Sequence, residues 1–366
     1  MSARRVGIVG AGQLGRMLAL AGYPLGIECR FVGDGPASPA GRIAPIRTAA
    51  LDDAAALAAL ASDVDVLTFE IENVSIAALT EVARRIAVYP PPSIVAIAQD
   101  RLAEKRLFES LSMPTAPFVA VDERADLERI GDSLGWPVVL KARRLGYDGR
   151  GQRVAASVAA LLSGWDDLGR VPAIVEGWVK FERELSLIAV RGAAGAEAYY
   201  PLTENVHRDG ILVSSIAPYG DSWLQRTAEQ WLREIMARFD YRGVLTVEFF
   251  LTPAGLVANE IAPRVHNSGH WTIEGAETSQ FENHLRAVLG WPLGATGVRG
   301  HAAMLNFLGR IPDSAAILAI PGAHLHDYGK EPRPGRKVGH CTLLDPARDR
   351  LLARIALLRA AIERGD

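Results

Sequence analysis

Short apolar runs alternate with amphipathic stretches through the first hundred residues. The runs at Arg5–Val9, Glu28–Val32 and Val64–Phe69 have the length of strands, and the stretches between them carry apolar residues at helical spacing. Such an alternation predicts an open parallel sheet covered by helices. The triplet Pro90-Pro91-Pro92 then breaks the pattern and predicts a domain boundary.

The rest of the chain is richer in strands. A helix predicted at Gln99–Leu111, starting near Arg101, leads into a smaller α+β segment with a helix at Arg124–Leu134. An amphipathic helix at Trp223–Phe239 precedes two further apolar runs. We therefore predict three domains at residues 1–98, 99–298 and 299–366, with a lid subdomain at about 113–176. The last domain is expected to be small and β-rich.

The two apolar runs after the amphipathic helix predict a β-hairpin. A three-residue loop at 253–255 would set Thr252 opposite Leu256, and counting back along both strands then sets Glu248 directly opposite Glu260. Two carboxylates roughly 5 Å apart on a sheet repel each other. A cation is expected between them, and Mg²⁺ favours carboxylate oxygens and substrate phosphates. Two solvated glutamates on an exposed face are the alternative.

A glycine-rich turn at Gly10–Gly15 follows the first strand with the spacing GxGxxG. This spacing fits the dinucleotide-binding fingerprint, and Asp34 lies where an acidic residue would hold the ribose of NAD. The same glycines would let any phosphate approach a helix N-terminus, so both interpretations stay open. Glu70 and Glu72 follow a later strand at the end where α/β sheets hold ligands, with a solvated loop as the alternative.

A lysine within an apolar strand needs an anion, because burying its charge alone is costly. Lys141 lies in such a run, and the glycine-rich segment Gly146–Gln152 comes next. The lysine precedes the glycines and no helix follows, so this is not a P-loop but a predicted lid over phosphates, or else a plain hairpin. For Lys105 and Lys180, an ordinary surface charge is the alternative.

Composition narrows the classes of partner. The net charge of −2 gives no reason to expect binding to nucleic acid or to a membrane surface. Cys29 and Cys341 form no spaced pair, and no apolar run approaches the ~20 residues of a membrane span. We predict a cytoplasmic protein with no nucleic-acid or membrane partner.

A lysine on a strand, a glycine-rich lid, a strand ending in Glu-Gly-Trp-Val and two hairpin glutamates together resemble the ATP-grasp pattern. The motifs GQLGR, GYDGRGQ, APRVHNSGHW and PGRKVGH narrow this to a resemblance to the N5-carboxyaminoimidazole ribonucleotide synthetase family, from Val6 to about Leu344. The resemblance implies an ATP-grasp fold with a Rossmann-like N-terminal domain. It also implies ATP, Mg²⁺ and bicarbonate acting on 5-aminoimidazole ribonucleotide in purine biosynthesis, and a homodimer.

The resemblance also assigns site residues, each by its position in a motif. Contacts to ATP fall to Arg101, Lys141, Gly146, Tyr147, Asp148, Gly149, Arg150, Gly151, Gln152, Glu176, Gly177, Trp178, Val179, Glu184, His207, Asn259 and Glu260. The Mg²⁺ ligands are Glu248 and Glu260. Contacts to the phosphoribosyl substrate fall to Gln13, Leu14, Glu72, Asn267, Lys330, Arg336 and Lys337, and the reactive centre to Tyr147, Asp148, Arg264, His266 and Lys337.

Two points stay open at this stage. Either His266 or Asp148 would manage the proton when the substrate amine is carboxylated. Ala262 stands where many ATP-grasp enzymes place an asparagine ligand, so tight binding of a second metal is not implied. The competing functions are a formate-dependent glycinamide ribonucleotide transformylase, a nicotinamide-dependent oxidoreductase and a catalytically silent nucleotide-binding regulator.

Overall fold

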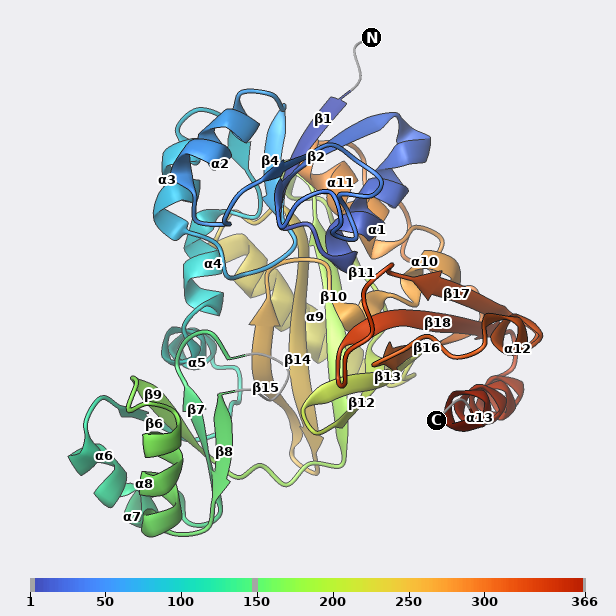
Figure 1. Ribbon diagram of the computed structural model, residues 1–366. Helices are drawn as coiled ribbons and strands as arrows, with labels where there is room; N and C mark the ends of the chain where they lie inside the picture. The colour runs from blue at the N-terminus through green and yellow to red at the C-terminus, as the bar shows by residue number, and fades with distance from the viewer. Residues whose placement is uncertain (1–3, 147–150, 365–366) are drawn as a thin grey trace.

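Three β-sheets organise the protein (Figure 1). The structure is a computed structural model that describes residues 4–146 and 151–364. A five-stranded sheet belongs to the N-terminal part, a four-stranded sheet to the lid, and a nine-stranded sheet to the remainder. The lid lies away from the other two sheets and is joined to them through the region of the helix Arg101–Ser110 (α5) (Figure 1).

The N-terminal sheet is open and fully parallel, as predicted, with the order β3-β2-β1-β4-β5. Side chains of β1 alternate between its faces: Val6 and Ile8 enter one hydrophobic core, and Val9 enters another. Helices α2 and α3 line the face of Val9, while α1 and α11 line the face of Ile8. The elements are β1 (Arg4–Val9), α1 (Gln13–Gly22), β2 (Ile27–Gly33), β3 (Ile46–Thr48), α2 (Ala54–Ala61), β4 (Val66–Phe69), α3 (Ile76–Ala83), β5 (Ala87–Val88) and α11 (Gln280–Val288).

A helix begins inside the proline triplet that predicted only a boundary. Helix α4 spans Pro92–Ala98 with Pro92 at its first position, where the missing N–H would have no partner in any case. Helix α5 follows and starts at Arg101, as predicted, because the Asp100 carboxylate accepts the Leu102 N–H at 3.0 Å and caps it.

The lid is a four-stranded antiparallel sheet of order β6-β9-β7-β8. Its core includes Leu140, Leu161 and Val175. The single helix predicted at 124–134 is wrong, since two short helices meet at Arg129. The elements are β6 (Phe118–Val121), α6 (Arg124–Glu128), α7 (Ile130–Leu134), β7 (Val138–Ala142), β8 (Gln152–Ala155), α8 (Val158–Asp167) and β9 (Ala173–Gly177).

The large sheet runs without a break from the hairpin to the C-terminal strands, in the order β15-β14-β10-β12-β13-β16-β18-β17, with β11 beside β10. The domain boundary predicted at 298/299 therefore separates strands of one sheet, and the domain limits stay predictions. The strands are β10 (Arg183–Arg191), β11 (Glu197–Tyr199), β12 (Thr203–Arg208), β13 (Ile211–Ala217), β14 (Gly243–Thr252), β15 (Gly255–Ala262), β16 (His301–Leu308), β17 (Ala323–Asp327) and β18 (Lys337–Asp345). The remaining α-helices are α9 (Ser222–Arg238), α10 (Thr272–Gly275), α12 (Ser314–Leu318) and α13 (Arg348–Arg364).

The two faces of β14 have different roles. Leu245, Val247 and Phe249 are buried in one core with Leu232 and Ile235 of α9. The alternation of side chains along the strand leaves Glu248 on the opposite face, where the site lies. Across the described residues, no helix is long and apolar enough to span a bilayer.

Candidate active site

The hairpin of β14 and β15 pairs Glu248 directly with Glu260, as predicted. The predicted route to that pairing is wrong. Thr252 pairs with Gly255, not with Leu256, so the ladder starts one residue out of the predicted register. If the pairing continued without a bulge from Thr252 and Gly255, Glu260 would no longer lie opposite Glu248.

A β-bulge at Asn259 restores the pairing. The register shifts between Glu248 and Phe249, and Asn259 is the additional residue on β15. Its carbonyl accepts a hydrogen bond from Lys105 Nζ at 3.1 Å, and Thr115 Oγ1 accepts another from the same ammonium at 3.0 Å. Lys105 is buried, so the alternative of an ordinary surface charge is wrong for this residue. The bulge is held by a buried cation that sequence patterns do not identify.

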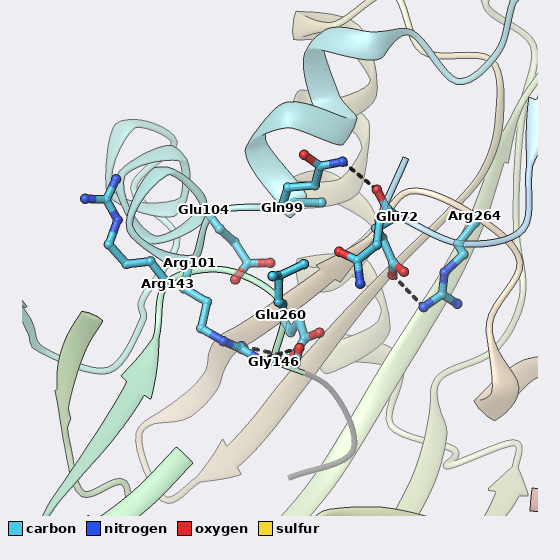
Figure 2. Close-up of a pocket in the computed structure, with 11 residues that line it drawn as sticks. Glu72, Gln99, Arg101, Glu104, Arg143, Gly146, Glu260 and Arg264 are labelled. Atoms are coloured by element: carbon cyan, nitrogen blue, oxygen red, sulfur yellow. Dashed lines mark hydrogen bonds and ion pairs between the residues drawn. The ribbon is translucent and has the colours of Figure 1, made fainter. Parts of the chain in front are cut away.

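The paired glutamates lie in an environment that favours a cation. Burial raises the pKa of Glu248 to about 7; the charge of His207 opposes this rise, and the facing Glu260 adds to it. The Glu260 side chain remains 45% exposed and lines the pocket of Figure 2. Glu248 is therefore the carboxylate of the pair whose ionisation a further cation would favour.

Arg101 holds Glu260 from the side of helix α5 (Figure 2). Its Nη1 lies 3.3 Å from Glu260 Oε2, and its Nη2 donates to the Gly146 carbonyl at 3.3 Å. Burial alone would raise the pKa of Glu260, but the charges of Arg101 and Lys141 lower it below its usual value. Glu104, which was not predicted, is buried beside them; its Oε1 accepts the Ile261 N–H at 2.6 Å. Burial, supported by the charge of Glu260, raises the pKa of Glu104 to about 8.

Lys141 finds the anion that its buried position requires. Its Nζ lies 2.8 Å from Glu176 Oε2, and Lys105 Nζ lies 3.6 Å from the other oxygen of the same carboxylate. Burial alone would raise the pKa of Glu176, but the charges of Lys141 and Lys105 lower it. Glu176 is the first residue of the Glu-Gly-Trp-Val segment, and its ion pair with Lys141 therefore holds that segment next to the strand lysine.

The other residues predicted to contact the nucleotide extend along the same side. Glu184 Oε2 lies 2.8 Å from His207 Nδ1. Burial would lower the pKa of His207, but its hydrogen bond to Glu184 and the charges of Glu248 and Glu184 together outweigh burial, and the pKa is raised. Gly177 is buried at the end of β9, whereas Trp178 is exposed and Val179 is half-buried.

Arg264 lines the same pocket as Glu260 and points toward Glu72 (Figure 2). Its Nη2 forms an ion pair with Glu72 Oε1, and the Glu72 carbonyl accepts from Gln99 Nε2 at 2.6 Å. Its Nη1 donates to the Val265 carbonyl at 3.0 Å. Among the described residues, no hydrogen-bond acceptor partners the buried Nε of Arg264. Glu72, predicted to bind substrate, here fixes the orientation of the guanidinium.

His266 lies beside the glutamate pair, which is the predicted metal end of the site. Its Nε2 is 3.5 Å from Glu248 Oε1, and its Nδ1 is 2.9 Å from Ser268 Oγ. Burial, with the positive charges of Arg264 and Lys337, lowers the pKa of His266 well below its usual value. The imidazole is therefore neutral at neutral pH. Gln280 fixes the backbone here, accepting the His266 N–H at 2.9 Å and donating to its carbonyl at 2.6 Å.

The GxGxxG turn holds a carboxylate of the protein itself. The N–H groups of Gly12 and Gly15 donate to the two oxygens of Glu70, which is buried. A Cβ atom at Gly10 would lie only 2.5 Å from Glu70 Cγ, and one at Gly12 would lie 2.8 Å from Glu70 Oε1. These glycines are needed for the close approach of Glu70. Sequence reasoning noted Glu70 but gave it no role.

The substrate residues predicted near this turn are partly brought together. Lys330 Nζ donates to Gln13 Oε1. This contact joins residues 330–337, which we call the basic turn, to the first turn of α1. Leu14 is buried. Burial raises the pKa of Glu70, and the charges of Lys330 and Arg264 oppose the rise. The positive charge of Lys330 in the basic turn therefore acts on Glu70 at the glycine turn.

Asn267, Arg336 and Lys337 differ in their surroundings. The Asn267 amide forms two hydrogen bonds with Asn306, at 3.1 and 2.8 Å, so both of its polar ends have protein partners. Arg336 donates to the Glu331 carbonyl at 3.2 Å. The charge of Lys337 acts on Glu248 and on His266, which places it at the metal end of the site. Tyr147, Asp148, Gly149 and Arg150 lie outside the described residues, and Gly151 and Gln152 return the chain to β8.

The two carboxylates suit a hard cation whose remaining ligands are water and substrate. No three His, Cys, Asp or Glu side chains of residues 4–146 and 151–364 are grouped to hold a metal on their own. Two facing carboxylates and an adjacent open pocket instead match Mg²⁺, which is commonly held by one or two carboxylates together with substrate phosphates and water. The residues fit the ion.

Family profiles match the chain in three consecutive segments. The ATP-grasp domain profile matches residues 106–281, the ribonucleotide synthetase preATP-grasp domain profile matches residues 3–99, and the phosphoribosylaminoimidazole carboxylase C-terminal domain profile matches residues 302–354. The predicted ATP-grasp fold with a preceding parallel-sheet domain is confirmed.

Full-length relatives agree with these segments. An N5-carboxyaminoimidazole ribonucleotide synthase from Pseudomonas aeruginosa is 49% identical over 98% of this chain and 99% of its own. The crystal structure of the corresponding synthetase from Thermus thermophilus is 48% identical, has a TM-score of 0.93, and is matched over 97% of this chain and 98% of its own. A synthase from Aspergillus clavatus, in complex with ADP and 5-aminoimidazole ribonucleotide, is 33% identical with a TM-score of 0.92, over 99% of both chains. This chain therefore belongs to the N5-carboxyaminoimidazole ribonucleotide synthase family of ATP-grasp ligases.

Proposed function

We propose that this ligase carboxylates 5-aminoimidazole ribonucleotide with bicarbonate and ATP, through carboxyphosphate, to give N5-carboxyaminoimidazole ribonucleotide, ADP and phosphate in purine biosynthesis. The family and the bound molecules of the Aspergillus clavatus structure support this reaction. The observation that carries the route is the pairing of Glu248 with Glu260 next to Arg264 and His266. This pairing supports a cation site at the two glutamates, with groups able to hold an anion beside it.

We assign the ATP end to the side of the lid. Lys141 and Arg101 supply positive charge, and Glu248 with Glu260 would hold Mg²⁺. When bound, the ion would neutralise charge on the transferring phosphoryl group. The Glu176–Val179 segment is the proposed adenine hinge, and Glu184, with His207 at 2.8 Å, the proposed ribose contact. The segment from Gly146 to Gln152 would exclude water from the labile acyl phosphate.

We assign the acid substrate to the space between Arg264 and the glutamate pair. A guanidinium offers a planar fork of donors that matches bicarbonate and its phosphorylated form. Glu72 and the Val265 carbonyl hold two of its nitrogens in place. The pocket there is lined mostly by polar and charged side chains, which suits a small oxyanion better than an apolar acid. The phosphoribosyl group would then reach toward Gln13, Lys330 and Lys337.

Oxygen tracing tests this route. We expect ADP formation to require bicarbonate, to be only weakly supported by formate, and to be accelerated by aminoimidazole ribonucleotide. With ¹⁸O-labelled bicarbonate, one labelled oxygen should appear in the released phosphate. Carboxylation of the ribonucleotide with unlabelled phosphate would disprove the carboxyphosphate step. Formate supporting the full rate would favour the transformylase instead.

The assembly and the cellular location are also proposals. The family resemblance implies a homodimer, and sedimentation equilibrium at micromolar concentration would show a single species of about twice the 39.4 kDa of the chain. A monomer there would contradict it. Cys29 and Cys341 are both free and buried, which agrees with a reducing cytoplasm.

A further inference from the structure

A line of buried polar side chains crosses the large sheet and ends on His266. Ser215 Oγ donates to Asn205 Oδ1 at 2.8 Å, and Asn205 Nδ2 donates to Ser186 Oγ at 2.9 Å. Ser186 Oγ donates to Ser268 Oγ at 2.8 Å, and Ser268 Oγ lies 2.9 Å from His266 Nδ1. The three serines and Asn205 are all buried. We call this set the polar line.

The sheet register explains why these residues meet. Asn205 of β12 pairs with Ser215 of β13, and Ser186 of β10 pairs with Glu248 of β14. Ser186 therefore lies on the same face as Glu248, while its neighbours Leu185 and Leu187 enter the opposite core. The polar line thus runs under the site and reaches it beside the glutamate pair.

The amide of Asn205 sets the direction of every bond. Its oxygen accepts from Ser215, and its nitrogen donates to Ser186. A hydroxyl has one proton, and Ser186 Oγ already accepts from Asn205, so the Ser186 proton goes to Ser268. The Ser268 proton is then directed at His266 Nδ1.

A second donor reaches the same atom independently of any hydroxyl. The backbone N–H of Ser268 donates to His266 Nδ1 at 3.2 Å. With both donors aimed at it, Nδ1 is an acceptor, and the ring proton resides on Nε2. That nitrogen lies 3.5 Å from Glu248 Oε1.

We propose that Asn205, acting through Ser186 and Ser268, is a positioning residue that holds His266 as a fixed Nε2–H donor toward the reacting acid and Glu248. His266 is then not the proton acceptor for the carboxylated amine. The inference rests on the proposed function in one respect, namely that a reacting anion occupies the space beside His266. A preoriented donor stabilises developing negative charge without reorganising during the reaction.

Two variants and one control test the polar line. Ser186→Ala removes a link, and Asn205→Asp replaces the donating nitrogen by an accepting oxygen. Ser214→Ala is the matched control: Ser214 is a buried serine of β13 whose hydroxyl has no hydrogen-bond partner among the described residues. If Asn205→Asp fails to fold, Ser186→Ala still carries the test.

The readout is the tautomer of His266, measured by ¹⁵N NMR on protein labelled at histidine, without substrate. His266→Gln identifies the signal by its loss. We expect the Nε2–H form in the wild type and in Ser214→Ala. In Ser186→Ala and Asn205→Asp we expect a partial gain of the Nδ1–H form, because Ser268 Oγ can then accept the ring proton while the backbone N–H of Ser268 still favours Nε2–H. In these two variants, kcat should fall about tenfold to a hundredfold with KM for ATP within about twofold. A merely structural role would leave the tautomer unchanged.

An Nδ1–H ring in the wild type would overturn the proposal. An unchanged tautomer or an unchanged kcat in both Ser186→Ala and Asn205→Asp would overturn it as well. The NMR result needs no turnover, so it is separate from the oxygen-tracing experiment. Failure of the proposed function would appear as missing bicarbonate dependence, whatever the tautomer of His266.

Discussion

Two carboxylates, the buried Glu70 at the glycine turn and the half-buried Glu248 on the hairpin, show how differently one residue type is used in this protein. Burial raises the pKa of both. Each oxygen of Glu70 accepts a backbone N–H, from Gly12 or from Gly15. Glu248 faces another carboxylate, Glu260, across the ladder.

This difference indicates a structural role for Glu70 and a ligand-binding role for Glu248. Amide donors satisfy Glu70 within the fold, so its charge holds the turn in place. In the Glu248–Glu260 pair, Arg101 contacts Glu260 alone, and the raised pKa of Glu248 shows that its negative charge would be stabilised by a further cation. The partners of a buried acid, more than its burial, therefore indicate whether it awaits a ligand. Substitutions at Glu260 and Glu248 test the binding pair, and a substitution at Glu70 tests the structural acid.

The largest effect is expected for Glu260→Gln. The substitution removes a charge from the proposed Mg²⁺ site but keeps the shape of the side chain. We expect turnover in a phosphate-release assay to fall by a factor of about a thousand or more, with a thermal midpoint within a few degrees of the wild type. Near-normal activity at limiting Mg²⁺ would contradict the assignment.

Glu70→Gln should act mainly on stability. An amide would bring an N–H group against the donors of Gly12 or Gly15, so we expect a loss of about 1–3 kcal/mol in the free energy of unfolding. Urea denaturation measures it. Glu28→Gln is the control in the same sheet, because Glu28 is exposed and its ion pair with Arg5 contributes little. A Glu70→Gln protein as stable as the control would show that the turn does not depend on the carboxylate.

The sequence predicted the Glu248–Glu260 pair much better than it predicted the role of Glu70. The Glu248–Glu260 pairing followed from strand periodicity, although the predicted register was wrong. The bulge at Asn259 that corrects it depends on Lys105, a residue more than 150 positions earlier in the chain. Periodicity contains no information about such a contact.

The role of Glu70 could not be predicted from the sequence either. The GxGxxG spacing correctly indicated a close approach to a helix N-terminus, but it cannot say whether a ligand or a side chain makes that approach. The approaching group, Glu70, directly follows β4 and lies 55 residues along the chain from Gly15. The helix α4 was missed because a proline triplet predicts an interruption even where Pro92 suits a first helical position.

A smaller effect is expected in the pH dependence of stability. The folded-state pKa of Glu248 is about 7, above its unfolded value, so the folded protein binds more protons between about pH 4.5 and 7. This group therefore makes the folded state less stable as pH rises through that window. Thermal melts without Mg²⁺ should show that Glu248→Gln removes this part of the decline. An identical pH profile in both proteins would contradict the raised pKa.

Cation binding measured directly is the sharpest test of the central claim, that the glutamate pair and not the glycine-turn acid awaits a cation. Mn²⁺ serves as the probe for Mg²⁺, and electron paramagnetic resonance reports the free ion during a titration in the presence of ADP. We predict that wild type and Glu70→Gln bind Mn²⁺ with the same affinity, and that Glu248→Gln binds at least about tenfold more weakly. Equal binding by wild type and Glu248→Gln, or equal weakening by Glu70→Gln, would contradict the claim.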